Sequence, residues 1–277
     1  MQIMGIVNTS PDSFSDAVRL TTAEQQIAHA RVLVACGAGI IDVGGESGVT
    51  YTEHTPVSEE IERVVPVIAA LSEDGVTVSI DTFKPAVAEA ALSAGATILN
   101  DVSALHDPEL ADVAAAHGAT LVITHTRAAP KQRSFPEVGD IVADVEELLV
   151  EKIALARDRG VEHIVVDPGP DFTKTPAQTI EVLRAIERVR ALQLPWLAAV
   201  SRKYFIGAIT GREPHERLAG TLAAVGWAAD HGAAIVRVHD VGEVHDYLAV
   251  RATLSGHAEV PEFDSEDERL MWIRHDR

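Results

Sequence analysis

Two groups of basic residues follow neighbouring apolar runs in the C-terminal part of this sequence. Ser201-Arg202-Lys203 ends one run, and Arg237-Val238-His239-Asp240 ends the next. Charged side chains are seldom fully buried unless they are paired, so cations at the ends of strands usually face a cleft. In a chain with a formal net charge of -19, two such groups predict a binding site for an anion.

Carboxylate and amide side chains follow several of the other apolar runs. Asp81, Asn100 and Asp167 each stand where a run ends, and they offer hydrogen-bond acceptors together with one amide group. These groups suit a flat ligand that is rich in N–H donors, such as a fused aminopyrimidinone. Further polar residues stand at the ends of other runs, namely Asn8, Asp42, Glu46, Asp101 and His125.

Asn8 and His239 are candidates for the surroundings of a bound phosphate. The side-chain oxygen of Asn8 suits a hard cation that neutralises the phosphate, and His239 adds a donor nearby. Single residues also have purely structural interpretations, because a histidine such as His239 is often held by hydrogen bonds of the fold and a single aspartate at a strand end often caps a loop. A ring of polar residues at the ends of successive strands is not needed by a scaffold, and this favours a functional site.

Short apolar runs alternate with longer amphipathic segments along the whole chain. Strands are expected at residues 2–7, 39–43, 76–80, 96–99, 119–123, 163–166, in the run through 200, and at 233–236. Helices are expected at 23–35, 58–71, 84–93, 108–117, 140–159, 176–190, 215–230 and 243–254. Continuous apolar strands are typical of parallel sheets that are buried on both faces. Eight such units in about 250 residues predict a (β/α)8 barrel, with a doubly wound open sheet as the main alternative.

Composition limits the classes of partner and the expected location. The 277 residues, of which 47% are hydrophobic, predict a single barrel domain over 1–277 with a short acidic tail from about residue 257. The negative charge argues against binding to nucleic acid or to a membrane surface. The chain starts without a basic leader, has no apolar run of about 18–20 residues, and has one cysteine, Cys36, expected to be buried. A cytoplasmic location is therefore expected.

Several longer segments carry a resemblance to a known family. They are MGIVNTSPDSFSD (4–16), IIDVGGES (40–47), SIDT (79–82), NDVSAL (100–105), DPG (167–169), FTKT (172–175), SRKYFIG (201–207), ERLAGTLA (216–223) and RVHDV (237–241). In this order the segments resemble dihydropteroate synthase, the folate-pathway enzyme that joins 4-aminobenzoate to a hydroxymethyl-dihydropterin diphosphate. The resemblance covers nearly the whole chain.

The resemblance implies a (β/α)8 barrel, usually dimeric, with a pterin pocket. It implies that the pterin ring is held by Asp81, Asn100, Asp167 and Lys203. Arg237 would lie against the pterin and would bind the diphosphate and its Mg²⁺ together with His239 and Asn8. Phe172 and Lys203 would border the aminobenzoate site. Lys203, Asp81 and Arg237 are the residues expected to act in catalysis.

The sequence also departs from the usual pattern of the family. After Gly-Gly-Glu-Ser the family usually has an arginine-containing Ser/Thr-Arg-Pro-Gly segment, where this chain has Gly48-Val49-Thr50-Tyr51. The usual Gly-Gly after SFSD is Ala17-Val18, and the usual Gly-Phe-Gly-Lys-Thr is Asp171-Phe172-Thr173-Lys174-Thr175. These changes leave three alternatives open: a pterin-binding paralogue without condensing activity, a transferase for another amine, and a related methyltransferase barrel. The cations that suit a diphosphate argue against the last.

Overall fold

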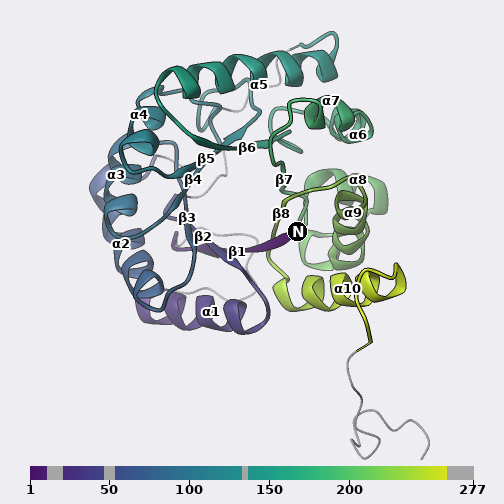
Figure 1. Ribbon diagram of the computed structural model, residues 1–277, viewed down its shortest axis with the longest axis horizontal. Helices are drawn as coiled ribbons and strands as arrows, with labels where there is room; N and C mark the ends of the chain where they lie inside the picture. Colours follow the sequence, from purple (N-terminus) through teal and green to yellow (C-terminus); the bar gives the residue numbers. More distant parts are fainter. Residues whose placement is uncertain (11–20, 47–53, 133–136, 261–277) are drawn as a thin grey trace, which may run out of the picture.

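Parallel strands form the centre of the computed structural model, which describes residues 1–10, 21–46, 54–132 and 137–260 (Figure 1). The strands are β1 (Gln2–Asn8), β2 (Ile40–Gly44), β3 (Val78–Asp81), β4 (Ile98–Asp101), β5 (Thr120–Thr124), β6 (His163–Asp167), β7 (Leu197–Ala198) and β8 (Ile235–Val238). They pair in the order β6-β5-β4-β3-β2-β1-β8-β7. A parallel bridge between Val166 and Trp196 brings the two ends of this order together, so the sheet nearly closes into a barrel.

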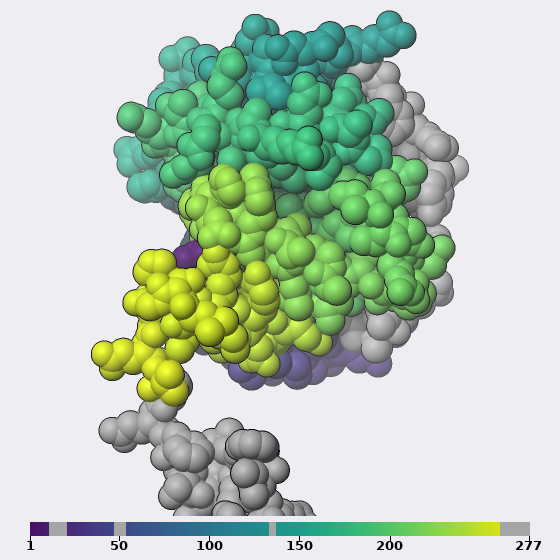
Figure 2. All heavy atoms as spheres, turned by 90° about the vertical axis from the view of Figure 1, so that its right-hand side faces the viewer, coloured from purple at the N-terminus to yellow at the C-terminus, as the bar shows by residue number. Residues whose placement is uncertain are grey.

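Helices surround this sheet on its outer side (Figure 1). They are α1 (Ala23–Ala35), α2 (Val57–Glu73), α3 (Pro85–Ser93), α4 (Glu109–Ala116), α5 (Ile141–Asp158), α6 (Pro176–Arg184), α7 (Glu187–Arg190), α8 (Tyr204–Thr210), α9 (Leu218–Asp230) and α10 (Val241–Leu254), with a 3-10 turn η1 (Pro214–Glu216). Figure 2 shows α10, in yellow, beside the green segment that holds α8 and α9 on one face of the molecule. The predicted (β/α)8 barrel is therefore confirmed.

Two apolar layers explain why the strands read as continuous hydrophobic runs. A small cluster fills the inside of the barrel and consists of Met4, Ile40, Ile98, Val122, Val165, Leu197, Ala199 and Ile235. A larger cluster lies between the strands and the surrounding helices, and it includes Val7, Ile41, Ile80, Leu99 and Val166. Successive strand side chains point to opposite faces, so both layers need apolar residues. The packed interior leaves the strand ends as the place for a site.

Most predicted elements have the expected position, and α1 has the predicted bounds. The Thr22 hydroxyl accepts a hydrogen bond from the Gln25 N–H (3.3 Å), and Gly37 follows the helix with φ 106°. Side-chain capping at the start and a left-handed glycine after the end are the usual signals of helix termini. The predicted helix over 176–190 is wrong, because it breaks into α6 and α7. The Ile186 N–H donates to the carbonyl of Leu183, the tighter spacing of a 3-10 turn.

The region after residue 196 differs most from the expectation. Strand β7 covers only Leu197–Ala198, whereas the predicted strand continues through residue 200, and the segment after Lys203 forms helix α8, for which no element was predicted. Helix α8 ends at Gly211, which has φ 71°, and α9 begins three residues later than predicted, after η1. Cys36 is exposed and not buried as expected, because it is the residue at the C-terminal cap of α1.

None of the described helices combines the length and apolar character needed to cross a membrane. The segments at Ala17-Val18 and Gly48-Val49-Thr50-Tyr51, and most of the tail from residue 257, lie outside the described residues.

Candidate active site

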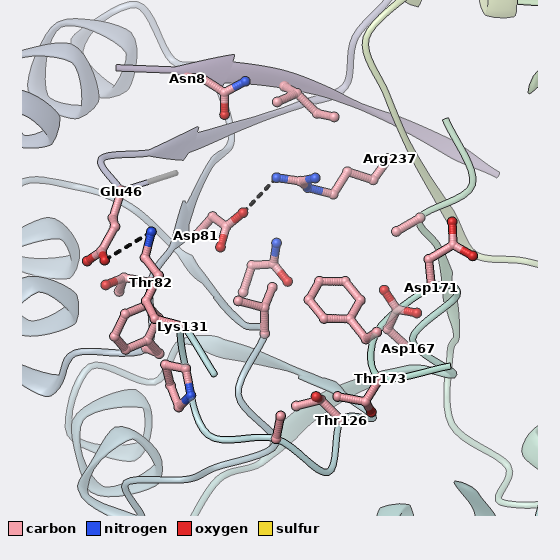
Figure 3. A pocket seen from close by; sticks show the side chains of 18 of the residues that line it. Asn8, Glu46, Asp81, Thr82, Thr126, Lys131, Asp167, Asp171, Thr173 and Arg237 are labelled. Atoms are coloured by element: carbon pink, nitrogen blue, oxygen red, sulfur yellow. Dashed lines mark hydrogen bonds and ion pairs between the residues drawn. The ribbon is translucent and has the colours of Figure 1, made fainter. Parts of the chain in front are cut away.

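A pocket of about 460 Å³ opens at the carboxyl ends of the strands (Figure 3). Its lining includes every residue that the sequence assigned to the site: Asn8, Asp81, Asn100, Asp167, Phe172, Lys203, Arg237 and His239. Asp81, Asn100 and Asp167 end or nearly end β3, β4 and β6, Asn8 ends β1, and Arg237 belongs to β8. Because parallel strands of a barrel run in the same direction, their carboxyl ends meet at one opening.

Arg237 is held by two carboxylates from neighbouring strands. Its Nε donates to Asp42 Oδ2 (2.6 Å), and its Nη2 donates to Asp81 Oδ2 (2.7 Å). Asn100 Nδ2 donates to the same Asp42 oxygen (3.1 Å), and the Asp42 side chain is fully buried. Asp42 therefore fixes the orientation of both Arg237 and Asn100. Asp42 is one of the predicted polar strand ends, but this orienting role is not visible in the sequence, because both partners are distant along the chain.

Asp81 lines the pocket beside Arg237, and its carboxyl has a raised pKa. Removal from water raises the pKa of Asp81 to about 7, Arg237 opposes this shift, and the Asp42 carboxylate adds to it. The Asp81 side chain keeps 22% of its surface exposed, toward the pocket. Asp81 can therefore change its protonation state near neutral pH, and a ligand that covers it or pairs with it will change that balance.

Asp167 and Lys203 form a second polar part of the wall, beside an aromatic ring. Asp167 is almost completely buried and accepts a hydrogen bond from the Gly169 N–H (2.7 Å). Burial raises the pKa of Asp167, and this hydrogen bond and the Lys203 ammonium oppose the rise. Lys203 Nζ lies 4.5 Å from the centroid of the Phe172 ring, a cation–π geometry. Burial lowers the pKa of Lys203, and Asp171 and Asp167 act in the opposite direction.

Several polar residues at strand ends do not line the pocket, namely Asp42, Asp101, His125 and Arg202. Arg202 forms a two-point ion pair with Asp240, with Nε to Oδ2 at 3.0 Å, and it does not line the pocket. His125 is fully buried behind the pocket wall, where it contacts Asp144. The predicted anion site therefore reduces to Lys203, Arg237 and His239, and the Nδ1 of His239 lies 3.1 Å from the Ser201 hydroxyl.

The side-chain oxygen of Asn8 fits a magnesium ion that takes most of its ligands from a substrate. Figure 3 shows the Asn8 side chain pointing into the pocket on the side of Asp81 and Arg237. Among the described residues there is no cluster of three or more acidic, histidine or cysteine side chains that would enclose a metal. Mg²⁺ commonly takes one or two protein oxygens together with phosphate oxygens and waters. One amide oxygen beside an anion site is compatible with that pattern.

The opposite rim holds a network of charges that the sequence analysis did not find. Lys84 Nζ donates to Glu46 Oε2 (2.5 Å) and Glu60 Oε2 (2.6 Å), and the Thr82 hydroxyl donates to Glu60 Oε1 (2.9 Å). Lys131 Nζ lies 3.4 Å from Glu46 Oε1. These contacts connect the segments that follow β2, β3 and β5 and give this rim of the pocket a balanced charge.

Two departures from the family pattern lie in the loop between β6 and α6. Asp171 and Thr173 stand where the family usually has glycine, and both have left-handed backbones, with φ 63° and 49°. The Asp171 carboxylate accepts hydrogen bonds from the Phe205 N–H (3.1 Å) and the Thr179 hydroxyl (3.2 Å). The Thr173 hydroxyl accepts one from the Arg127 N–H (3.2 Å). The replacements therefore keep the glycine-like backbone and add contacts to neighbouring elements.

Comparison with known proteins gives the class to which this barrel and pocket belong. A profile of the family described as "Pterin binding enzyme" matches residues 4–239. The chain is 40% identical to the dihydropteroate synthase of Bacillus subtilis over 87% of this chain and 84% of that protein. The architecture and the polar pocket are thus those of a pterin-binding barrel enzyme.

Solved structures narrow the assignment. The dihydropteroate synthase of Xanthomonas albilineans with 4-aminobenzoic acid has a TM-score of 0.84 and 40% identity, covering 94% of both chains. The same enzyme in complex with 7,8-dihydropteroate has a TM-score of 0.82 at the same identity and coverage. The chain belongs to the dihydropteroate synthase family, and its activity is the transferase activity of that family.

One relative is much longer than this chain. The sequence is 43% identical to a probable bifunctional folylpolyglutamate synthase/dihydropteroate synthase of Haloferax volcanii, over 87% of this chain but only 29% of that protein.

Proposed function

We propose that this chain condenses 6-hydroxymethyl-7,8-dihydropterin diphosphate with 4-aminobenzoate, giving 7,8-dihydropteroate and diphosphate. The observation that carries the proposal is the single pocket in which Asp81, Asn100 and Asp167 lie with Lys203 and Arg237. Acceptors and an amide suit the edge of an aminopyrimidinone, and the cations suit a diphosphate. Relatives at about 40% identity that were crystallised with 4-aminobenzoic acid and with 7,8-dihydropteroate support the choice of substrates.

The pterin ring binds between the carboxylates and Lys203 in this proposal. Asp81 and Asp167 accept hydrogen bonds from the ring and amino N–H groups, Asn100 bonds a further ring atom, and Lys203 donates to the ring. Asp42 keeps Asn100 and Arg237 in position by the contacts described above. Preorganised side chains of this kind lower the reorganisation that the transition state requires.

The reaction breaks the bond between the methylene carbon and the diphosphate oxygen, and the electron pair leaves with the diphosphate. The dihydropterin ring spreads the positive charge that develops on the methylene carbon. The nitrogen of 4-aminobenzoate then forms the new C–N bond and loses a proton to solvent. An arylamine is a neutral nucleophile at about pH 7, so electrostatic stabilisation matters more than a strong base. The carboxylates beside the ring stabilise the developing cation, and Arg237 and His239 stabilise the leaving diphosphate.

Asn8 is the proposed protein ligand of Mg²⁺. Bound there, the ion would neutralise charge on the diphosphate and so make it a better leaving group. Its remaining ligands would come from phosphate oxygens and waters, because the described residues offer no enclosing acidic cluster.

Phe172 and Lys203 border the proposed site for 4-aminobenzoate. The flat face of Phe172 suits an aromatic ring, and the Lys203 ammonium 4.5 Å from its centroid places a positive charge on the same side. One lysine then contacts both substrates, which favours their alignment for the transfer.

A homodimer in the cytoplasm is the proposed state of the protein. Exposed apolar side chains occur on α8 and α10, namely Tyr204, Ile209, Val250 and Leu254. Apolar residues on such an outer face are typical of contacts between copies. Analytical ultracentrifugation of the purified chain measures this state, and a monomer across the accessible concentration range contradicts it.

The proposed reaction is tested by product formation with the purified chain, both substrates and Mg²⁺. We expect 7,8-dihydropteroate and diphosphate in equal amounts, strong inhibition by a chelator, and recovery when Mg²⁺ is added back. Other arylamines tested in parallel show whether 4-aminobenzoate is the preferred acceptor. Binding of the pterin diphosphate without product from any arylamine contradicts the proposal and identifies a pterin-binding paralogue.

A further inference from the structure

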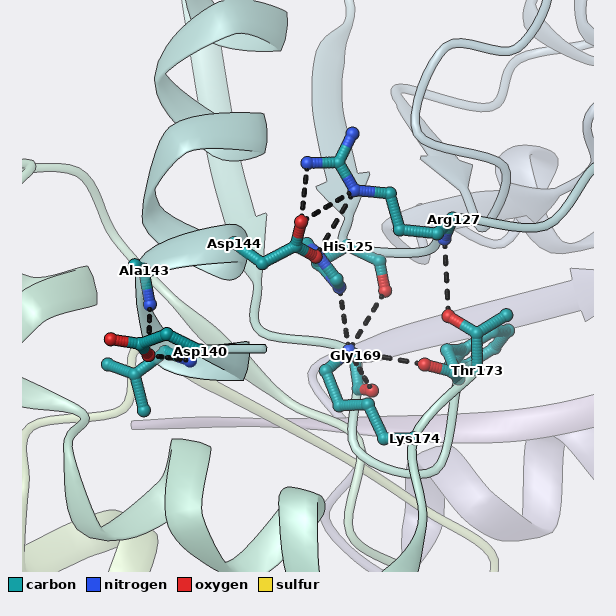
Figure 4. Close-up of polar contacts among 10 residues, drawn as sticks. His125, Arg127, Asp140, Ala143, Asp144, Gly169, Thr173 and Lys174 are labelled. Atoms are coloured by element: carbon teal, nitrogen blue, oxygen red, sulfur yellow. Dashed lines mark hydrogen bonds and ion pairs between the residues drawn. The ribbon is translucent and has the colours of Figure 1, made fainter. Parts of the chain in front are cut away.

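Lys174 is a buried lysine behind the pocket wall that the proposed chemistry does not use. Its residue keeps 2% of its surface exposed, and its Nζ lies among acceptors (Figure 4). The ammonium contacts the carbonyl oxygens of Gly169 (2.9 Å), Phe172 (3.2 Å) and His125 (3.4 Å), and it lies 2.7 Å from His125 Nδ1. A lysine with this degree of burial needs a compensating role or compensating contacts.

The contacts of His125 define which of its nitrogens carries the proton. Its Nε2 lies 3.0 Å from Asp144 Oδ2, so this nitrogen donates and Nδ1 accepts from Lys174. Burial and the Lys174 charge lower the pKa of His125 to about 3, so the ring is neutral. Asp144 also binds Arg127 with two N–H groups and lies in α5, whose start is capped by Asp140.

The contacts of Lys174 connect two segments that shape the pocket. Gly169 and Phe172 belong to the loop between β6 and α6, whereas His125 directly follows β5. The same loop carries two left-handed residues, Asp171 and Thr173, a conformation that costs energy for side chains other than glycine. The Lys174 ammonium fixes the direction of the Gly169 and Phe172 carbonyls in this loop. It thereby also fixes the position of the Phe172 ring, which faces Lys203.

We propose that Lys174 is a positioning residue of the condensation reaction, and that its protonated form holds the Gly169–Thr173 loop in the shape that presents Phe172 and Asp167 to the substrates. This inference rests on the proposed function. The ammonium has three N–H donors for the acceptors around it, whereas the neutral amine has two and turns a lone pair toward an acceptor. Loss of the proton therefore weakens the hydrogen bonds by which Lys174 holds the loop.

The protonation of Lys174 is balanced near neutral pH. Burial lowers the pKa of Lys174 to about 7. The charged and titratable groups that face it are Asp167 at the end of β6, Asp171 in the loop, His125 after β5, Asp144 on α5 and Lys203 after β7. The carboxylates raise the pKa and Lys203 lowers it, so the charge of Asp144 is one of the supports of the protonated form. We therefore expect kcat/KM to fall as the pH rises through this range.

The first test removes the hydrogen bonds that Lys174 donates. Lys174→Met keeps the length of the side chain and removes its donors, and we expect kcat/KM to fall about 100-fold, as a displacement of about 1 Å in an aligned site does. Lys152→Met on α5 is the matched control, since Lys152 pairs with the exposed Glu151, does not line the pocket and should keep wild-type kinetics. Wild-type kinetics for a folded Lys174→Met protein overturns the inference.

The second test moves the pH profile without touching the pocket. Asp144→Asn removes a charge that raises the pKa of Lys174, so the alkaline decline of kcat/KM should move to lower pH. The charges that act most strongly on Lys203 are Asp171, Asp167, Arg237 and Asp81, so a decline caused by Lys203 would stay in place. Glu151→Gln, an exposed α5 carboxylate, is the control and should leave the profile unchanged.

The outcomes separate this inference from the proposed function. If the wild-type chain forms no dihydropteroate, the proposed function is wrong, and the profile of pterin diphosphate binding replaces kcat/KM as the readout. If the wild-type chain is active but Asp144→Asn leaves the alkaline limb unmoved, the positioning role of protonated Lys174 is overturned while the function stands. A limb that moves to lower pH in Asp144→Asn and not in Glu151→Gln supports it.

Discussion

Single residues in the pocket serve both binding and structure, and Arg237 is the clearest case. Its guanidinium binds Asp42 and Asp81, so it is oriented before any ligand arrives. Breaking one side of a buried ion pair typically costs about 3–5 kcal/mol, because the remaining charge loses its partner. Substitution of Arg237 is therefore expected to affect stability as well as turnover, and it is a poor probe of catalysis alone.

Asp81 is also a partner of Arg237, but the pH dependence of its variant separates the effect on activity from the effect on stability. We expect Asp81→Asn to lower kcat/KM by at least about 100-fold, since a placed electrostatic partner of the transition state is typically worth about 2.7–4 kcal/mol. We also expect the difference in Tm, variant minus wild type, to become more favourable to the variant between about pH 5 and pH 8.

The direction of the pH effect follows from the raised pKa of Asp81. The folded protein keeps a proton on this carboxyl up to about pH 7, whereas the unfolded chain loses it near the ordinary aspartate pKa of 3.8. Between these values the folded state binds more protons, so its free energy of unfolding decreases as the pH rises. The asparagine variant has no carboxyl at this position, so it lacks this pH-dependent loss of stability. Thermal unfolding of both proteins at several pH values measures it, and a difference in Tm that moves toward the wild type with rising pH contradicts the assignment.

At the scale of elements, the loop between β6 and α6 concentrates the features that set the site. It presents Phe172 to the pocket and holds Asp171 and Thr173 in left-handed conformations. It also contains Lys174, whose ammonium donates to the Gly169 carbonyl of the same loop. The Asp171 carboxylate also receives a hydrogen bond from the Phe205 N–H of α8. The loops after β6 and β7 are therefore mechanically linked, which keeps Phe172 and Lys203 together.

Thr173 tests whether the loop stores backbone strain. A left-handed conformation costs a residue with a side chain roughly 1–2 kcal/mol, and the hydrogen bond to the Arg127 N–H returns about 1 kcal/mol. Thr173→Ala keeps the strain and loses the bond, so it should destabilise the protein by about 1 kcal/mol. Thr173→Gly also relieves the strain, so it should be the more stable of the two variants. Denaturant unfolding measures the order, and a less stable glycine variant contradicts the strained loop.

The sequence predicts the elements well where the local signals are strong. The polar strand ends Asp81, Asn100 and Asp167 were visible because an apolar run that stops at a polar residue is a local pattern. Helix α8 was not predicted, because it is only seven residues long and Tyr204-Phe205-Ile206 is apolar and β-favouring, so no helical period is visible. The burial of Lys174 was not predictable, because two of its acceptors belong to His125, which comes to it only through the pairing of β5 with β6.

The pairing of distant side chains also decided which cations belong to the site. Arg202 and Lys203 are adjacent and read as one basic group, but Arg202 has a left-handed backbone and turns to Asp240. The difference depends on α9, since the Arg202 N–H donates to the Thr221 hydroxyl. No periodicity within the run shows such a contact.

At the scale of the whole molecule, closure of the barrel is what turns scattered strand ends into one site. The ring closes weakly between β6 and β7, through the Val166–Trp196 bridge and the hydrogen bond from the Val166 N–H to the Pro195 carbonyl (3.0 Å). Asp167 and Lys203 lie on the two sides of this closure. The assembled barrel therefore sets the distance between the Asp167 carboxylate and the Lys203 ammonium.

The central claim is that Asp167 and Lys203 act together at one pocket on one pterin substrate. Its most direct test is the rate of dihydropteroate formation for Asp167→Ala and Lys203→Ala, with Arg188→Ala on α7 as the control, since the Arg188 side chain is 57% exposed and pairs with Glu146. We expect both pocket variants to fold and to lose at least about 100-fold in kcat/KM, and the control to match the wild type. Near-wild-type kinetics for either pocket variant would contradict the account.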